Sequence, residues 1–304
     1  MSISETARRA THAAAGRPIA VLLVGVLAMA WASILIRWAA APPLVVGAGR
    51  MTAAALILAP FAWRQGMAEW HSLSRREWLL LVLAGVALGL HFASWITSLG
   101  MTSVASSVVL VSATPLFVAL ATPLVLRERV PWVLALSVIL AMAGSAIIGM
   151  ADAHAIGGAL TGDLLALNGA LMASVYMLVG RRLRRKLSLL AYIWPMYGLA
   201  AVVLLVGCAL AGQPLAGYSP RVYGLLVLLA LGPQIVGHSS ANWALRYLSP
   251  TFVTVAILGE PLGATVLALL LLGERPSPTL LLGGAILLLG IGLAIHSEQQ
   301  REAS

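Results

Sequence analysis

The chain has 304 residues, of which 61% are hydrophobic and 10% charged, and its formal net charge at pH 7 is +9. Average soluble chains carry roughly 25% charged residues, so this composition excludes a soluble globular domain. The basic residues lie in short segments between apolar runs, which favours a role in membrane orientation over nucleic-acid binding.

Apolar runs long enough to cross a bilayer recur along the whole chain and predict ten transmembrane helices. We place them at residues 18–38, 43–63, 78–99, 103–126, 131–149, 163–180, 188–210, 221–244, 249–272 and 277–296. The first run, from Ile19 to Ile36, is longer than the apolar region of a cleaved signal peptide, so we predict a retained helix. The fold class is therefore an all-α polytopic membrane protein.

The distribution of Lys and Arg predicts the orientation of these helices. With the N-terminus in the cytoplasm, fifteen of the nineteen Lys and Arg residues fall on the cytoplasmic side. Cytoplasmic loops are enriched in these residues, so we predict that both termini are cytoplasmic. The basic loop from Arg181 to Lys186 supplies five of the fifteen, and we favour an orienting role for it over lipid-headgroup binding.

A motif recurs at an offset of 146 positions. Pro115 is followed by the pair Glu128-Arg129, and Pro261 is followed at the same spacing by the pair Glu274-Arg275. Five spans per half is an odd number, so the second half enters the membrane in the opposite sense to the first. The sequence thus predicts two inverted five-helix repeats, an arrangement that transporters use to place a substrate site between their halves.

The repeat divides the chain into five segments. We predict a cytoplasmic tail over 1–17, a first five-helix repeat over 18–149 and a periplasmic linker over 150–162. A second five-helix repeat follows over 163–296, and a cytoplasmic tail over 297–304 ends the chain.

The chain resembles the drug/metabolite transporter (DMT) superfamily and its EamA-type bacterial permeases. The resemblance rests on ten spans in two inverted halves, each of which has a helix with a Pro near its start and a Glu-Arg pair near its end. The resemblance covers roughly 18–296, with 91–149 and 238–295 as the cores, and Arg50 resembles an arginine common there. It implies transport of amino acids, nucleobases, sugars, cationic drugs or other metabolites. Export across the bacterial inner membrane is the usual direction in that family.

Two charged residues lie inside predicted spans. Glu260 is near the middle of the ninth span beside Pro261, where a carboxylate is costly unless it is paired, protonated or hydrated. We favour proton coupling or binding of a substrate ammonium for Glu260 over a purely structural pair. Arg50, in the second span, is a candidate partner for that carboxylate, a candidate ligand for a substrate carboxylate, or a side chain that reaches the outer interface.

Polar and aromatic side chains also gather within the spans. We predict that the stretch with His238, Asn242 and Trp243 lines a central cavity together with His91 and Trp95, with helix-to-helix bonding as the alternative. In the sixth span, residues four apart predict a further lining stripe of Asn168, Met172 and Tyr176. Pro115 and Pro261 are predicted hinges, and glycines in the third and tenth spans are predicted contacts between helices.

The sequence contains no phosphate-binding Gly loop, no His-Glu-x-x-His and no soluble domain to hydrolyse ATP, so we predict no enzymatic activity, cofactor or metal site. We expect a secondary active transporter that works by alternating access on a small metabolite such as an amino acid. Protons or a counter-substrate would drive it, the lipid bilayer surrounds it, and a homodimer is compatible with the sequence. The alternative is a lipid-handling membrane protein or a membrane enzyme.

Overall fold

The computed structural model describes residues 3–98, 100–102, 104–151, 160–273 and 275–303. Within these ranges the chain forms helices and no strand, and ten segments are long and apolar enough to cross a membrane. They are Arg17–Ala39, Pro43–His71, Arg75–Ser98, Ser107–Val125, Trp132–Met150, Leu160–Arg184, Leu189–Leu210, Pro220–Ala244, Pro250–Leu271 and Pro278–Arg301. The ten predicted spans are confirmed, and the largest difference is the second helix, which continues past residue 63 to His71.

The helical elements outnumber the spans because three spans are interrupted. Seven elements each form one span: α1 (Ile3–Ala39), α2 (Pro43–His71), α3 (Arg75–Ser98), α6 (Trp132–Ala151), α7 (Leu160–Arg184), α8 (Leu189–Leu210) and α13 (Pro278–Ala303). The fourth span joins α4 (Val104–Val111) to α5 (Thr114–Val125), and the ninth joins α11 (Pro250–Ile257) to α12 (Glu260–Leu272). The eighth consists of α9 (Pro220–Leu229), η1 (Ala230–His238) and α10 (Ser239–Ala244).

Local sequence sets several helix starts. Pro43, Pro220 and Pro250 are each the first residue of a helix, where a missing backbone N–H costs nothing. The start of α3 has a capping box, in which the Ser74 backbone N–H donates to Glu77 Oε2 at 2.8 Å and the Glu77 N–H donates to Ser74 Oγ at 3.3 Å. Short turns therefore suffice to reverse the chain between apolar spans.

The breaks between α4 and α5 and between α11 and α12 lie 146 positions apart. Pro115 and Pro261 are the second residues of α5 and α12. A proline lacks the N–H that would bond the carbonyl four residues earlier, so each removes one rung of the helix at its break. The repeat found in the sequence is thus present as a pair of broken helices in equivalent spans, and a hinge role for the two prolines stays a prediction.

The eighth span contains a nine-residue π-helix, η1, around Pro233. Such wider turns are rare and occur frequently at functional sites. The matching stretch of the first half, residues 84–92, lies within the regular α3. The two halves therefore differ most in helix geometry at η1.

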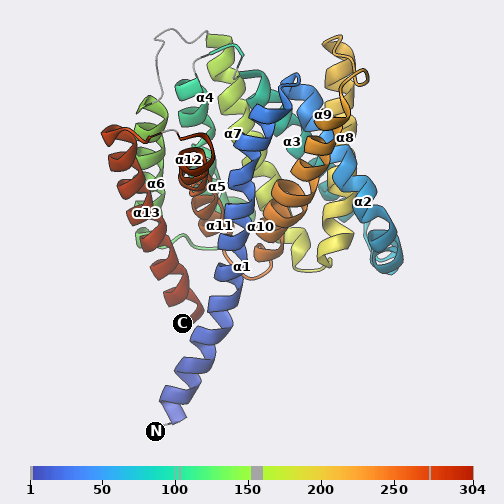
Figure 1. Cartoon of the computed structure of the whole chain (residues 1–304). Helices are drawn as coiled ribbons and strands as arrows, with labels where there is room; N and C mark the ends of the chain where they lie inside the picture. The colour runs from blue at the N-terminus through green and yellow to red at the C-terminus, as the bar shows by residue number, and fades with distance from the viewer. Residues whose placement is uncertain (1–2, 99, 103, 152–159, 274, 304) are drawn as a thin grey trace.

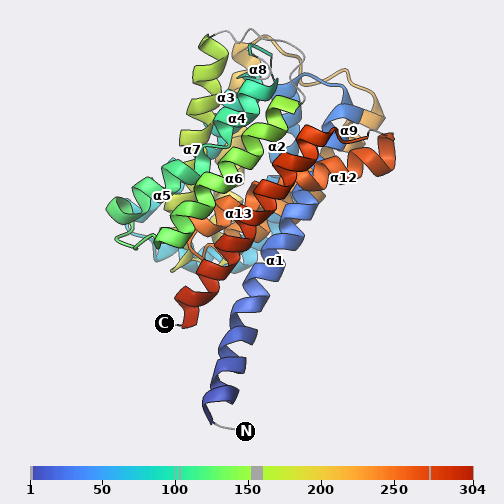
Figure 2. The same cartoon turned by 90° about the vertical axis from the view of Figure 1, so that its left-hand side faces the viewer.

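Close helix contacts depend on glycine at part of the tenth span: a Cβ on Gly290 of α13 would lie 2.7 Å from the backbone nitrogen of Ala141 on α6, whereas a Cβ on Gly292 would have nothing within 4 Å, so the prediction is wrong for Gly292. Figures 1 and 2 both show α6 and α13 side by side. A Cβ on Gly144 of α6 would lie 2.5 Å from the backbone nitrogen of Leu287 on α13. The predicted contacts of Gly85 and Gly89 in the third span are likewise present against α8, where an added Cβ would lie 2.6 Å from a side chain at each position.

Both termini lie at the same end of the molecule, which we call the termini end (Figure 1). The N-terminal segment predicted as a tail is helical from Ile3 and forms the start of α1. Most of the predicted linker 150–162 lies outside the described residues, which resume at Leu160.

Candidate functional site: a polar cluster between the two halves

Arg50 of α2 connects the two halves of the chain inside the membrane region. Its guanidinium donates to Oε1 of Gln234 in η1, from Nε at 3.2 Å and from Nη2 at 2.6 Å. Only 4% of Arg50 is exposed, and Gln234 is fully buried. The Arg50 side chain therefore does not reach the outer membrane–water interface, one of the three arrangements considered for it.

Aromatic rings surround the Arg50 guanidinium. Its central carbon lies 4.8 Å from the ring centroid of Phe92 on α3, a cation–π geometry. The Phe92 ring is 4.9 Å from that of His91 and 5.7 Å from that of His238, and His91 stacks on Trp95 at 6.1 Å. Four of the predicted residues, Arg50, His91, Trp95 and His238, thus belong to one cluster with Phe92.

Several buried polar atoms of this cluster have no hydrogen-bond partner among the described residues. They are Gln234 Nε2, His238 Nδ1, Trp95 Nε1 and, one helical turn further, Asn242 Oδ1. An unpaired polar group in an apolar interior is costly, and native structures contain few of them. Each of these atoms therefore has capacity for a further hydrogen bond.

Glu260 is the first residue of α12 and is partly exposed. It lies within electrostatic range of Arg50 without forming a direct ion pair. It also accepts no hydrogen bond from any residue that the structure describes. The charges of Glu260 and Arg50 therefore interact electrostatically without a hydrogen bond between the two side chains.

The repeat partner of Glu260 is Thr114, the first residue of α5. Its Oγ1 donates to the carbonyl of Val111 at 2.8 Å, the carbonyl whose helical partner is lost at Pro115. A carboxyl group can donate the equivalent bond at the second break only when it carries a proton. The two breaks match in position. They differ in the side chain that could bond the carbonyl freed by the proline, which is a hydroxyl at the first break and a carboxyl group at the second.

The sixth-span residues lie beside this cluster on α7. The Asn168 side chain donates to Ser94 Oγ of α3 at 2.9 Å, and the Gly169 carbonyl pairs with His91 Nδ1 at 2.8 Å. Tyr176 is buried and interacts electrostatically with Arg50 and Glu260. The stripe therefore places Asn168 against α3 and Tyr176 in the buried interior.

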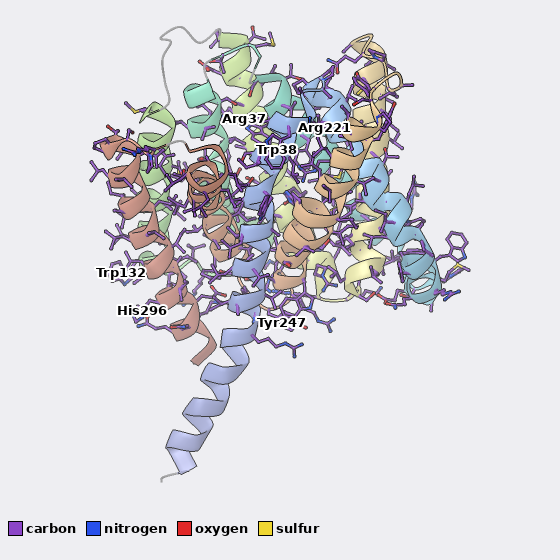
Figure 3. The ribbon with its side chains drawn as sticks, viewed as in Figure 1. Arg37, Trp38, Trp132, Arg221, Tyr247 and His296 are labelled. Carbon is purple, nitrogen blue, oxygen red and sulfur yellow. The ribbon has the colours of Figure 1, made fainter. Side chains whose placement is uncertain are left out.

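The eighth-span residues divide between two places. Asn242 donates to the His238 carbonyl at 2.8 Å and stays near the cluster. Trp243 instead packs on Tyr247, with ring centroids 4.6 Å apart, and among the described residues no ring contact or hydrogen bond joins it to the other predicted site residues. Figure 3 places Tyr247 toward the termini end, together with Trp132 and His296, whereas Arg37, Trp38 and Arg221 lie toward the opposite end.

Three members of the cluster were not predicted as site residues. Gln234 was not among the predicted lining residues, and Phe92 carried no signal because it is one apolar residue among many. Tyr197 of α8 shares a 3.0 Å hydrogen bond with Ser239 Oγ, and both hydroxyls approach the Gln234 carbonyl. The polar residues that follow Gln234 in the sequence, from His238 to Trp243, were the nearest signal to these three residues.

Comparisons with known proteins agree with this architecture. The model of the EamA-like transporter family matches residues 16–150 and again 160–295. A crystal structure described only as that of a protein superposes with a TM-score of 0.77 at 19% identity, covering 94% of this chain and 99% of the other, and shows the same fold. No curated protein matches the chain. Because the family model matches both halves and thus most of its length, the chain belongs to the EamA-like transporter family.

Proposed function

We propose that this protein is a secondary active transporter that exports small metabolites, such as amino acids or related compounds, across the bacterial inner membrane. The two repeats, 18–149 and 163–296, would alternate access to the cluster between them, with both termini in the cytoplasm. The observation that carries this proposal is the buried Arg50–Gln234 contact between the halves, surrounded by polar atoms without partners.

The chemistry of the cluster favours a substrate with both charges. Arg50 offers a planar set of donors that suits a carboxylate, and Glu260 offers an acceptor for an ammonium or a proton. The rings of His91, Phe92 and Trp95 provide an apolar and aromatic wall. Membrane-buried ionisable residues of this kind mark substrate and ion pathways.

Protons or a counter-substrate would supply the drive. In this proposal, protonation of Glu260 lets its carboxyl group donate to a carbonyl at the second helix break, as Thr114 does permanently at the first. Proton binding would thereby change the geometry of the ninth span during the transport cycle.

Transport in proteoliposomes tests this proposal. Labelled amino acids, nucleobases and sugars are each measured with and without an imposed pH gradient, and Arg50→Lys is compared with Arg64→Lys, a control at an exposed position of the same helix. We expect transport of at least one zwitterion by the wild-type and Arg64→Lys proteins and its loss in Arg50→Lys. Equal transport by all three would refute a role for Arg50 in substrate binding.

A further inference from the structure

The end of α7 and the turn after it bind acidic residues of the first half. Arg181 Nε donates to Glu128 Oε1 at 3.0 Å, and the neighbouring Arg185 bonds the same oxygen. Lys186 lies 2.9 Å from Glu77 Oε2 at the start of α3. The residues predicted as a free basic loop are therefore largely engaged within the protein, and Arg181 to Arg184 form the last turn of α7.

Further contacts join the same segment to two other helices. Glu69 of α2 accepts the backbone N–H of Ser188 at 2.6 Å. Arg181 Nη1 donates to the Leu245 carbonyl at 2.8 Å, and Arg184 Nε donates to the Asn242 carbonyl at 3.1 Å. The buried Arg181 thus binds both Glu128, which follows α5, and the carbonyl of Leu245, which follows α10. Asn242 of the polar cluster lies in α10.

The opposite end has no equivalent set of acids in its sequence. At the offset of 146, the counterparts of Glu69, Glu77 and Glu128 are Leu215, Tyr223 and Glu274. Two of the three carboxylates are therefore missing from the second half. Among the described residues, ion pairs of Glu128 and Glu77 join the halves at the termini end, and a hydrogen bond from Thr102 Oγ1 to Asp163 Oδ1 at 2.7 Å joins them at the opposite end.

We propose that these residues form an ionic lock that holds the termini end closed. The ionic lock consists of Glu69, Glu77 and Glu128 in the first half and of Arg181, Arg185, Lys186 and Ser188 in the second. This inference rests on the proposed alternating access. Opening the termini end requires Arg181 and Arg185 to leave Glu128 and Lys186 to leave Glu77.

The energetics favour Arg181 and Glu128 as the dominant pair of the lock. Exposed ion pairs such as Lys186–Glu77 contribute little on their own, because solvent screens them. Arg181 is 6% exposed, so removal of Glu128 leaves a buried cation without its counter-charge and selectively destabilises the closed state. Neighbouring Arg182 is exposed and forms no ion pair with any residue that the structure describes, which makes it a matched control.

Cysteine accessibility provides a test that does not depend on the substrate. Cys208, the single cysteine, is replaced by serine, and Met172→Cys near the middle of α7 serves as the reporter. A membrane-impermeant thiol reagent is applied to vesicles from the side of the termini or from the opposite side. A terminal epitope tag identifies the side in each preparation.

We expect Glu128→Gln and Arg181→Gln to raise the modification rate from the termini side by about fivefold or more, the lower range of ordinary conformational coupling. Modification from the opposite side should fall, and Arg182→Gln should match the parent. The double variant should fall short of the sum of the two single effects, because both changes break the shared contact between Arg181 and Glu128. Glu128→Arg combined with Arg181→Glu tests whether a reversed pair restores closure.

Two results would overturn the lock. One is an unchanged rate in both single variants, provided that they are inserted at the level of the parent. The other is an equal increase in Arg182→Gln, which would indicate a general effect of charge. The proposed function is tested separately. It would be refuted if the wild-type protein transported none of the compounds, and the accessibility difference could still be measured in that case.

Discussion

The contact between Arg50 and Gln234 allows a quantitative test of how the two halves are held together. Three variants form the test: Gln234→Met, Arg50→Met, and both changes together. Gln234→Met leaves a buried guanidinium without its acceptor, retaining only the Phe92 ring at 4.8 Å. Leaving a buried donor without its acceptor costs about 1–3 kcal/mol for a neutral group and more for a charged one, so this variant should be the least stable.

The other two variants should be affected less. Arg50→Met leaves a neutral amide oxygen unsatisfied, which costs about 1–3 kcal/mol, and Glu260 loses its nearby positive charge. The double variant places two apolar side chains against each other and leaves neither partner unpaired. It should therefore be more stable than Gln234→Met by about 2 kcal/mol or more, although it carries one more substitution.

Unfolding of the purified proteins in mixed micelles, with a rising fraction of denaturing detergent, measures these differences. A double variant less stable than Gln234→Met would refute the reasoning, because it would show that the two side chains contribute independently. Substrate binding is expected to be lost in all three variants. Stability and function therefore separate in the double variant, which should fold well and fail to transport.

Three further predictions follow from single positions. Gly144→Leu should destabilise the protein by about 1–3 kcal/mol or more, because an added Cβ meets a backbone nitrogen of α13 at 2.5 Å, whereas Gly292→Leu on an open face should be neutral in the same unfolding assay. Thr114→Val should cost about 1 kcal/mol through loss of its bond to the Val111 carbonyl, and a stability unchanged from wild type would show that this bond does not close the break. Glu260→Thr, which copies the first half, should insert normally and lose the pH dependence of transport in proteoliposomes; retained pH dependence would assign proton coupling elsewhere.

Most of the fold was predictable because each transmembrane helix appears in the sequence as a long apolar run. Ten apolar runs gave ten spans, and the offset of 146 located both broken helices through Pro115 and Pro261. The π-helix around Pro233 was not predictable, since a proline within a span is compatible with a kink, a break or a wider turn. The prediction of which residues share a helix face used the α-helical repeat of 3.6 residues per turn. That repeat does not hold in a π-helix, so it could not place Gln234 against Arg50.

The site was predictable to the extent that polarity is rare in this chain. Arg50, Glu260 and His238 stood out because charged and ionisable groups within a span are energetically costly and often mark functional sites. Phe92 and Tyr197 did not stand out, because aromatic residues are common in apolar helices, and only the packing of α2, α3 and α8 gives them a role. Trp243 shows the opposite error, because its neighbours in sequence suggested the cluster while its ring lies against Tyr247.

The ion pairs at the termini end change the meaning of the net charge of +9. During insertion the chain presents Arg181, Arg185 and Lys186 as unpaired cations, and these are the charges that influence orientation. After folding they are matched by Glu128 and Glu77, so the same residues contribute far less to the field that surrounding lipids experience. A positive charge counted along the sequence thus describes the nascent chain better than the folded carrier.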